Sequence, residues 1–428
     1  MTQVPDGIIE AEVLALGHSG DGVVEHEGRK LYVPYAAPGD VLELNASEGG
    51  DRAAIRRILT PAAIRAAPPC PHFGDCGGCA LQHLADPYVA EWKRQQVIDA
   101  LAHRGLTDIC VRNILTMPPA ARRRAAFTAS RNDGGIEIGF HAAMSKRLIP
   151  ISACAVLDPR IVRALPGLAQ MLTPLLRAGQ TARLLATQTQ TGLDVDVQTG
   201  SGRKAGPGLR VRSLLAAAVE KLDLARLSLD GVILLERRKP LILIGDVQIS
   251  PPPGAFLQAS SEAQNALIQL VLEALGPQAL SAKRARVLDL FAGCGTFTFP
   301  VAPHVRVHAV EGDASMIAAI RTAANQAQGL KQIEVSHRDL QRSPLLAEEL
   351  SPYAAVIFDP PRAGAKTQAA QIAASSVGRV IAVSCAQATF ARDARTLVDA
   401  GFQLRWAAPV DQFRWSAEVE LVALFERS

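Results

Sequence analysis

The chain has 428 residues, of which 48% are hydrophobic and 20% charged, a composition typical of a globular protein with two or three domains. Its 45 Lys and Arg against 41 Asp and Glu give a net charge of +4, too small to indicate a nucleic-acid partner without local clustering. No apolar run approaches the roughly 18 residues of a membrane span, and the start, MTQVPDGIIEAEV, lacks the basic and apolar regions of a signal peptide. We therefore expect a cytoplasmic monomer with no membrane partner.

Short β-type runs separated by glycine-rich breaks fill the N-terminal segment. The runs are IEAEVLALG, GVVEHEGRKLYVP, GDVLELNAS and AAIRRIL. They predict a small β-barrel or sandwich, for which an oligonucleotide-binding barrel is one candidate. The Pro- and Ala-rich stretch PAAIRAAPPCP, residues 61–71, is typical of a linker.

Three closely spaced cysteines follow the linker in CPHFGDCGGC. They have the spacing C-x5-C-x2-C and are Cys70, Cys76 and Cys79. An odd total of seven cysteines in a long chain argues against a secreted disulfide framework, and thiolates grouped so closely in a reducing compartment usually bind metal. The five-residue gap favours an iron–sulfur cluster over zinc, whose paired ligands are usually about two to four residues apart. Cys154 in ISACAVLD is the preferred fourth ligand, ahead of His72 and His83.

The remaining chain mixes helix-like and strand-like runs in two different patterns. From Trp92 to Pro253, runs such as AEWKRQQVIDALAHRG and LDVDVQT predict a central α/β domain. After SPPPGAF, a helical run ends at Gly276 and the apolar runs RVLDLF, RVHAVE, AAVIFDPP, RVIAVS and ELVALF alternate with helical ones. That alternation predicts a parallel, doubly wound sheet with helices on both faces.

A tight glycine turn follows the first of these strands in RVLDLFAGCGTF. Gly293 and Gly295 allow the backbone to approach a ligand at the carboxyl edge of the sheet. Glu311 ends the next strand, about where an acidic side chain holds ribose hydroxyls. Asp289 within the strand and the incomplete G-x-G-x-x-G, whose last position is Thr298, favour S-adenosylmethionine over a dinucleotide.

Later strands of the same sheet carry further candidates. Asp359 in AAVIFDPPRAG precedes two rigid prolines that would hold its carboxylate as a fixed acceptor. Cys385 in VSCAQATFARD follows the next strand; a lone thiol usually serves packing, but one at this edge could attack an electrophilic carbon. In DQFRWSAEVELVALFERS, Glu418 and Glu420 are two residues apart on one face, and either could be a general base.

Together these motifs resemble the RNA uracil-5 methyltransferases, which make 5-methyluridine with S-adenosylmethionine. The N-terminal runs are similar to the family's TRAM domain, an oligonucleotide-binding-type barrel, and CPHFGDCGGCALQH is similar to its iron–sulfur motif. ARRRAAFTAS, GAFLQAS, DLFAGCGTF, DPPRAG and VSCAQATFARD resemble its Arg-rich strand, Phe-x-Gln-x-Asn segment, cofactor turn, Asp-Pro-Pro-Arg and catalytic-cysteine motifs. The resemblance implies an α/β protein with three domains: a TRAM-like barrel at 1–62, a central α/β domain with the cysteine cluster and an RNA-binding surface at 63–254, and a Rossmann-like class I methyltransferase domain at 255–428.

The resemblance also implies a role for each matching residue. Cys385 would be the nucleophile, Glu420 the base, and Cys154 the fourth ligand of a 4Fe–4S cluster. The implied cofactor-binding residues are Gln258, Phe291, Glu311, Asp339 and Asp359. Two departures from the family pattern are Ser260 in place of asparagine and residues 414–416, Arg-Trp-Ser, in place of Pro-His-Thr.

The implied reaction is methyl transfer from S-adenosylmethionine to carbon 5 of a specific uridine in 23S ribosomal RNA. Attack of the Cys385 thiolate on carbon 6 makes carbon 5 nucleophilic, and Glu420 then removes the carbon 5 proton so that the cysteine is eliminated. A small-molecule methyltransferase would not need Cys385, and a non-catalytic RNA-binding protein would need neither residue.

The target uridine must leave its stack to reach such a site, as expected for a flipped base in a stem-loop. Phosphate contacts are expected from Arg122, Arg123, Arg124 and Arg131. The alternative substrate is the T-loop uridine of transfer RNA. The TRAM-like domain and the cysteine cluster favour ribosomal RNA, because bacterial transfer-RNA members of the family commonly lack both.

Overall fold

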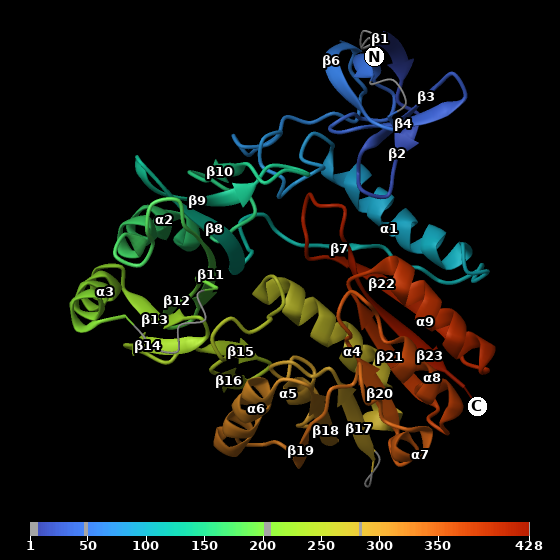
Figure 1. Ribbon diagram of the computed structural model, residues 1–428. Helices are drawn as coiled ribbons and strands as arrows, with labels where there is room; N and C mark the ends of the chain where they lie inside the picture. The colour runs from blue at the N-terminus through green and yellow to red at the C-terminus, as the bar shows by residue number, and fades with distance from the viewer. Residues whose placement is uncertain (1–6, 47–49, 201–206, 282–284, 428) are drawn as a thin grey trace.

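The computed structural model describes residues 7–46, 50–200, 207–281 and 285–427 (Figure 1). Residues 1–6 and 428 lie outside the described residues. They include the first residues of the expected barrel, where a signal peptide would begin, and the last residue of the expected methyltransferase domain. Every helix among the described residues is too short or too polar to span a membrane. Three regions follow one another along the chain, each built around its own sheet or pair of sheets.

Two three-stranded antiparallel sheets form the N-terminal region. Their strand orders are β1-β5-β6 and β2-β3-β4. Alternate residues such as Leu31 and Val33, or Leu42 and Leu44, are buried in a core that the two sheets share, so the region is barrel-like as predicted. The strands are β1 (Gly7–Glu12), β2 (Ala15–Leu16), β3 (Gly22–His26), β4 (Arg29–Val33), β5 (Val41–Ala46) and β6 (Ala53–Thr60).

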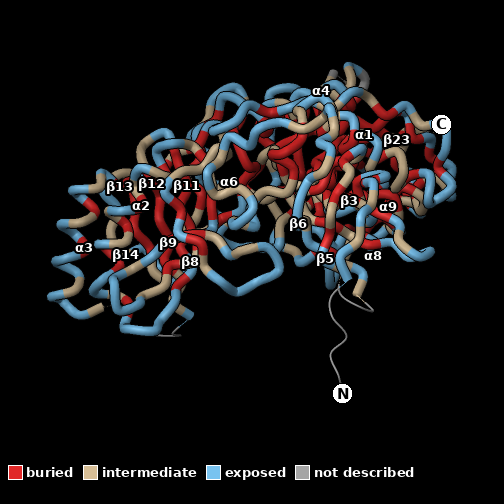
Figure 2. Tube along the Cα trace, turned by 90° about the horizontal axis from the view of Figure 1, so that it is seen from above, coloured by how far each residue is buried: buried red, intermediate tan, exposed pale blue. Residues whose placement is uncertain are grey.

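A seven-stranded sheet of order β10-β9-β8-β11-β12-β13-β14 forms the central region. All its pairings are antiparallel except that of β12 with β13. Helices α2 (Pro159–Leu172) and α3 (Leu209–Lys221) cover one face and enclose an apolar core (Figures 1 and 2). The strands are β8 (Arg124–Asn132), β9 (Gly135–His141), β10 (Leu148–Pro150), β11 (Thr181–Thr189), β12 (Gly192–Gln198), β13 (Leu224–Leu229) and β14 (Val232–Glu236).

An eight-stranded sheet of order β19-β18-β17-β20-β21-β23-β22-β7 forms the C-terminal region. The strands from β19 to β21 are parallel, as predicted, but β23 runs antiparallel to both β21 and β22. The chain reverses directly between β22 and β23 through residues 412–419, and strands joined without a crossover helix must be antiparallel. The strands are β17 (Arg286–Leu290), β18 (Arg306–Glu311), β19 (Ile333–His337), β20 (Ala355–Phe358), β21 (Arg379–Ser384), β22 (Gln403–Asp411), β23 (Glu420–Glu426) and β7 (Leu115–Thr116).

Helices cover both faces of this sheet, as in a doubly wound fold. One apolar core lies beneath α4 (Ser261–Ser281), α5 (Thr298–Val301), α6 (Ala314–Gln326) and the hairpin β15 (Ile242–Ile244) to β16 (Val247–Ile249). The other lies beneath α1 (Asp86–Ala102), α7 (Ala347–Leu350), α8 (Lys366–Ala374) and α9 (Gln387–Asp399).

Helix α1 and strand β7 join this sheet although they precede the central sheet in the chain. Figure 1 shows α1 beside α9 and β22, and Val97 and Leu101 of α1 are buried in the core of that face. Strand β7 pairs with the end of β22. The chain thus passes from the barrel to the C-terminal sheet before it builds the central one, and this path brings α1 against the loop 412–419.

Candidate active site

Four of the predicted site residues meet at one edge of the C-terminal sheet. Asp359 and Cys385 directly follow β20 and β21, and Glu311 is the last residue of β18. Because these strands are parallel, their carboxyl ends lie at the same edge. Glu420 begins β23, and since this strand is antiparallel its start lies at that edge too.

Cys385 is half-buried beside two acids. Burial, and then the negative charges of Glu420 and Asp359, raise the pKa of the Cys385 thiol to about 12. The thiol is therefore protonated at neutral pH in the ligand-free protein, and both carboxyls lie close enough to act on it electrostatically. A nucleophilic role requires that a proton acceptor or a positive charge enters the site.

The two glutamates of the last segment have different environments. Glu420 is 3% exposed, and burial, then Asp359, raise its pKa well above the ordinary value, while a hydrogen bond from Gln412 lowers it. Glu418 lies in the loop before the strand and forms an ion pair of 2.9 Å with Arg362 near the surface. The expectation that the two side chains share one face of a strand is therefore wrong, because β23 begins only at Glu420.

The glycine turn after β17 is held by Glu311. Its Oε2 accepts a hydrogen bond of 2.9 Å from the backbone N–H of Gly293, and its Oε1 accepts from the next two backbone amides of its own chain. Phe291 has φ of 61°, a left-handed conformation that costs energy in a non-glycine residue and marks a constrained turn. Asp339, which is exposed, lies with its backbone against Gly312, beside Glu311.

Two buried acceptors near this turn have no hydrogen-bond partner among the described residues. They are Gln258 Oε1 and Asp289 Oδ1. Gln258 Nε2 donates to Asp359 Oδ2 at 3.4 Å, and burial raises the pKa of Asp289 and of Asp359 to about 7 in each case. Unpaired buried acceptors are costly, so the site suits a ligand that brings donors and positive charge, as S-adenosylmethionine does with its ammonium and sulfonium groups.

The departure at Ser260 has a local explanation. Ser260 is 3% exposed, and its Oγ accepts a hydrogen bond of 3.0 Å from the backbone N–H of Ala263. Serine is a favoured N-cap residue, so here the side chain starts helix α4.

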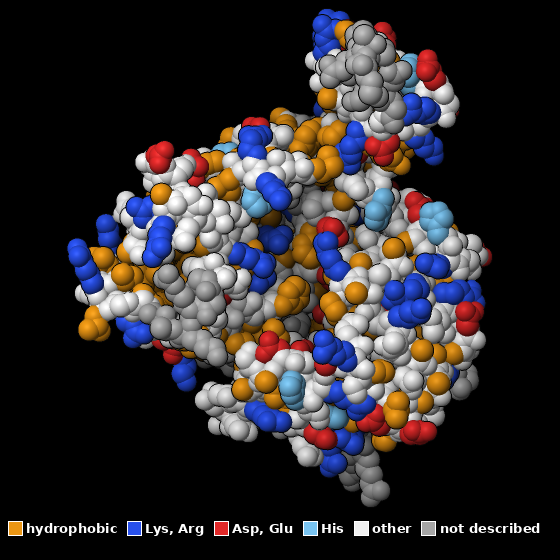
Figure 3. Space-filling model, viewed as in Figure 1, with side chains coloured by type: hydrophobic (Ala, Val, Ile, Leu, Met, Phe, Trp, Pro, Cys, Tyr) orange, Lys and Arg blue, Asp and Glu red, His pale blue; other side chains and the backbone are white. Residues whose placement is uncertain are grey.

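The expected phosphate contact is wrong for Arg123, which is buried and used within the chain, and it stays a prediction for the half-buried Arg122, Arg124 and Arg131. Arg123 is 6% exposed and donates to the Gln258 carbonyl and, at 2.8 Å, to Gln264 Oε1. Arg131 donates to the carbonyls of Thr173 and Leu176 at the end of α2. The run lies where the central sheet packs on the segment before α4, so Arg123 fixes the predicted cofactor residue Gln258. Figure 3 shows Lys and Arg side chains around the hollow between the central and C-terminal regions.

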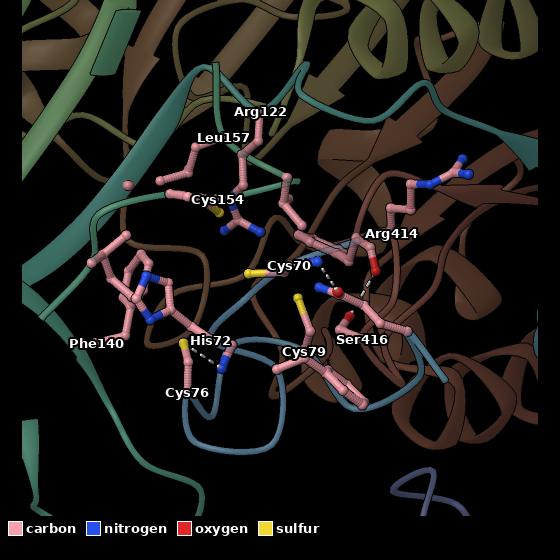
Figure 4. Close-up of a pocket in the computed structure, with 18 of the residues that line it drawn as sticks. Cys70, His72, Cys76, Cys79, Arg122, Phe140, Cys154, Leu157, Arg414 and Ser416 are labelled. Atoms are coloured by element: carbon pink, nitrogen blue, oxygen red, sulfur yellow. Dashed lines mark hydrogen bonds between the residues drawn. The ribbon is translucent and has the colours of Figure 1, made fainter. Parts of the chain in front are cut away.

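The four predicted metal-binding cysteines line one cavity of about 240 Å³ (Figure 4). They are Cys70, Cys76, Cys79 and Cys154. The Arg122 guanidinium reaches into the same space. His72 also lines the cavity, with its Nε2 hydrogen-bonded to Ser152 Oγ at 3.0 Å, whereas His83 is buried against the Ala36 carbonyl.

The loop before Glu420 forms another wall of this cavity. Phe413, Arg414 and Ser416 line it. Within the described ranges, no group of three or more His, Cys, Asp or Glu side chains is arranged to hold a metal ion. The iron–sulfur cluster therefore stays a prediction that the shared cavity supports.

Two residues near Glu420 were missed by sequence reasoning. Gln412 donates to Glu420 Oε2 at 2.5 Å, and Lys93, fully buried in α1, forms an ion pair of 2.5 Å with Asp411. Neither carries a motif signal: Gln412 stands at the variable position of Asp-x-Phe, and a lysine in a helix is usually solvated. The available hint was Asp411, an acidic residue at the end of an otherwise apolar strand segment.

Comparisons with known proteins agree with this arrangement. Residues 247–428 match the family model described as tRNA (uracil-5-)-methyltransferase. A Caulobacter vibrioides protein named an uncharacterized RNA methyltransferase is 44% identical over 424 residues, which cover 96% of this chain and 98% of that protein. A similarly named protein of Brucella melitensis is 42% identical over 415 residues, 97% of each chain.

Two further matches cover nearly the whole chain. The 23S rRNA (uracil(1939)-C(5))-methyltransferase of Shewanella amazonensis is 29% identical over 431 residues, 98% of this chain and 95% of that protein. The second match is the crystal structure of the Pyrococcus abyssi tRNA (uracil-54, C5)-methyltransferase with S-adenosyl-L-homocysteine. It aligns with a TM-score of 0.73 at 21% identity, over 97% of this chain and 99% of that one. The two chains therefore share a fold. From the sheet edge, the glycine turn and these matches together, the chain belongs to the S-adenosylmethionine-dependent RNA (uracil-5-)-methyltransferase family.

Proposed function

We propose that the protein methylates carbon 5 of a specific uridine in 23S ribosomal RNA through a covalent bond between Cys385 and the uracil. The observation that carries this proposal is the meeting of the Cys385 thiol with the buried carboxyls of Glu420 and Asp359 at the edge that also holds the glycine turn. A thiol and a carboxyl beside a cofactor turn are what uracil C5 methylation requires, since carbon 5 is a poor nucleophile until a thiolate has added to carbon 6.

Cys385 would act first. Its Sγ attacks carbon 6, and the carbon 5 to carbon 6 double bond becomes an enolate with negative charge delocalised from carbon 5 onto the carbonyl oxygen. Bound S-adenosylmethionine supplies the electrophilic methyl group that carbon 5 accepts. Glu420 then takes the proton from carbon 5, the double bond re-forms, and Sγ leaves carbon 6 as a thiolate. The thiol proton of Cys385 is lost to solvent before the attack. From the thiolate onward protons and electrons balance, because the methyl group replaces the proton that Glu420 takes and S-adenosylhomocysteine leaves.

The cofactor would lie over the glycine turn. Gln258 and Asp289 supply buried acceptors that have no partner among the residues that the structure describes, and Glu311 and Asp339 lie side by side further along the edge. Phe291, in its left-handed conformation, and Asp359 complete the predicted set. Arg123 holds the Gln258 segment in place by donating to the Gln258 carbonyl.

The choice of ribosomal RNA rests on the whole-length similarity to a 23S ribosomal RNA enzyme. The same chemistry on the T-loop uridine of transfer RNA is the second candidate, supported by the whole-chain fold similarity to a transfer-RNA enzyme. The barrel does not separate the two, because that structure also aligns over nearly its full length.

One experiment tests the reaction and the substrate together. The protein is incubated with S-adenosylmethionine and either 23S ribosomal RNA or transfer RNA made with 5-fluorouridine, in which carbon 5 carries fluorine and no proton can be removed. We expect a covalent protein–RNA adduct with ribosomal RNA that is absent in Cys385→Ala. An adduct with transfer RNA alone would move the proposal to the second substrate, and no adduct with either RNA would refute the mechanism.

We also propose that the cysteine cavity holds a 4Fe–4S cluster. Four thiols in one space form, once deprotonated, a donor set that suits an iron–sulfur core, and the Arg122 guanidinium beside them favours the thiolate form of Cys154. A cavity of about 240 Å³ is larger than a single zinc ion needs, since Zn–S bonds are about 2.3 Å long. Anaerobic purification followed by iron, sulfide and zinc analysis distinguishes the two; zinc without iron would replace the cluster.

A further inference from the structure

Gln412 bridges two parts of the site that are far apart in sequence. It directly follows strand β22 and is 5% exposed. Its Nε2 donates to Glu420 Oε2 at 2.5 Å, and its Oε1 accepts from the backbone N–H of Ala259 at 3.1 Å. The residue before Ala259 is Gln258, whose amide meets Asp359. Gln412 therefore joins the proposed base to the segment that holds the cofactor residue.

The orientation of the Gln412 amide follows from its two partners. A backbone N–H can only donate, so Gln412 must turn its oxygen to Ala259 and its NH₂ group to Glu420. Glu420 Oε2 must then accept this hydrogen bond, which favours the ionised carboxylate and disfavours a proton on that oxygen. A proton taken up by Glu420 has Oε1 as its available position.

The backbone on both sides of Gln412 is fixed by one lysine. Lys93 of α1 is fully buried, and its Nζ donates to Asp411 Oδ1 at 2.5 Å and to the Phe413 carbonyl at 3.0 Å. This buried amine thus holds the residue before and the residue after Gln412. Arg414, one residue further, pairs with Asp86 of the same helix at 2.5 Å.

We propose that Gln412 is a positioning residue that keeps Oε2 of Glu420 as a permanent acceptor and so reserves Oε1 for the proton of uracil carbon 5, with Lys93 and Asp411 as its anchor. The inference rests on the proposed role of Glu420 as the base. The charged and titratable groups that face Glu420 are Asp359, Arg362, Cys385 and Glu418. They are unchanged when Gln412 is replaced, so a change in the titration of Glu420 reports the loss of this hydrogen bond.

The test separates proton removal from methyl transfer. Total RNA from a strain lacking this chain, labelled with [5-³H]uridine, is incubated with enzyme and [methyl-¹⁴C]S-adenosylmethionine across a range of pH. Tritium release reports removal of the carbon 5 proton, and covalently bound ¹⁴C reports methyl transfer. The variants are Gln412→Met, of similar size without the donor, and Gln368→Met as control. Gln368 is a fully buried glutamine of α8 whose amide likewise bridges backbone groups, those of Leu345.

We expect Gln412→Met to slow tritium release at neutral pH by about 10- to 100-fold, the range for losing a hydrogen bond to a charged group. The midpoint of the release profile moves to higher pH, because the donor favours the ionised carboxylate and the proton-removal step needs that form. In a single turnover, with enzyme in excess over target sites, methyl transfer keeps its rate, and methylated covalent protein–RNA complex accumulates. Gln368→Met keeps the wild-type midpoint.

Other results overturn the inference. The inference is refuted if the pH midpoint of tritium release in Gln412→Met equals that of the wild type. This holds whether the rates of tritium release and methyl transfer are unchanged or fall together, as a purely structural role would cause. If Gln412→Met does not fold, Gln412→Glu retains the shape and the acceptor for Ala259 and places an acceptor against Oε2; a midpoint that does not rise in this variant also refutes the role. A wild-type enzyme that releases no tritium from any RNA refutes the proposed function itself, which is a distinguishable failure.

Discussion

The described part of the molecule places half-buried thiols in two settings, the cavity that four cysteines line and the sheet edge that holds Cys385, and comparing them shows what each requires. In the cysteine cavity, burial and then the charges of neighbouring cysteines raise the pKa of Cys79 to about 12, against a hydrogen bond with Gln82 that lowers it. At the sheet edge, burial raises the pKa of Cys385 to the same value, but the neighbouring charges belong to Glu420 and Asp359. Several thiols around one space suit a shared metal group as thiolates, whereas one thiol beside carboxyls suits acid–base chemistry.

The two regions share one piece of chain. Residues 413–416 supply walls of the cysteine cavity, and Gln412 and Glu420 lie on either side of that segment. The cavity and the active site are therefore neighbours through the loop between β22 and β23, which α1 fixes through Lys93. Variants of this loop and of the residues that contact it test whether a change at the active site alters the cysteine cavity.

The largest expected effect is that of Glu420→Gln. Without a base, turnover should fall by about 10²- to 10⁴-fold, while Cys385 still adds to the RNA and the covalent complex persists. Iron content should equal that of the wild type, because the change leaves the cavity residues intact. Turnover within a factor of about ten of the wild type would refute the assignment of the base.

The next effect is on stability, in Lys93→Met. Loss of the amine leaves the Asp411 carboxylate buried without its partner, which should lower the free energy of unfolding by about 3–5 kcal/mol. Tryptophan fluorescence reports on this region, because the three tryptophans, Trp92, Trp406 and Trp415, lie in α1, in β22 and in the loop.

The matched control for Lys93→Met is the double variant Lys93→Met with Asp411→Leu. It removes both charges and should recover most of the lost stability. A single variant as stable as the wild type would show that the pair is not needed to hold the loop.

A smaller effect concerns the reactivity of Cys385 in Asp359→Asn. Burial raises the pKa of Asp359 to about 7, so at pH 8 this carboxyl is mostly ionised and raises the pKa of Cys385. Its removal should accelerate alkylation of Cys385 by iodoacetamide about 3- to 10-fold, equivalent to half to one pKa unit. The difference should disappear as the pH falls below the pKa of Asp359, where the wild-type carboxyl is neutral too.

Peptide mass spectrometry measures this alkylation, with the exposed Cys110 as an internal reference. Slower alkylation of Cys385 in Asp359→Asn would contradict the electrostatic account. The four cavity cysteines should react as in the wild type, which distinguishes the two groups of thiols.

The smallest effect is expected for Glu418→Gln, the neighbour of Glu420. An ion pair as exposed as that of Glu418 with Arg362 contributes about 0–1 kcal/mol, so turnover should stay within about fivefold of the wild type. A loss as large as that of Glu420→Gln, in the same steady-state assay, would show that the base had been assigned to the wrong glutamate.

Much of the site could be predicted because its signals are local. The glycine turn, the acid at the end of β18, the prolines after Asp359 and the thiol after β21 each occupy a short segment, and strand ends at a parallel edge must meet. The three closely spaced cysteines are also a local signal, and in the structure they line one cavity together with Cys154. The division into domains at residues 62 and 254 remains a prediction, and α1 packs on the C-terminal sheet although the expected central domain contains it.

The sequence by itself determined the fold class, the family and the candidate nucleophile, base and cofactor residues. Each of these depends on a short motif, and the strand or turn that the motif forms decides where its side chains lie. Only the tertiary structure decided that Arg123 serves the chain and not RNA, that Glu420 is buried while Glu418 is paired at the surface, and that Lys93 holds a loop 318 residues away. Charged and amide side chains take their role from the partners that the fold brings to them, and no local pattern contains those partners.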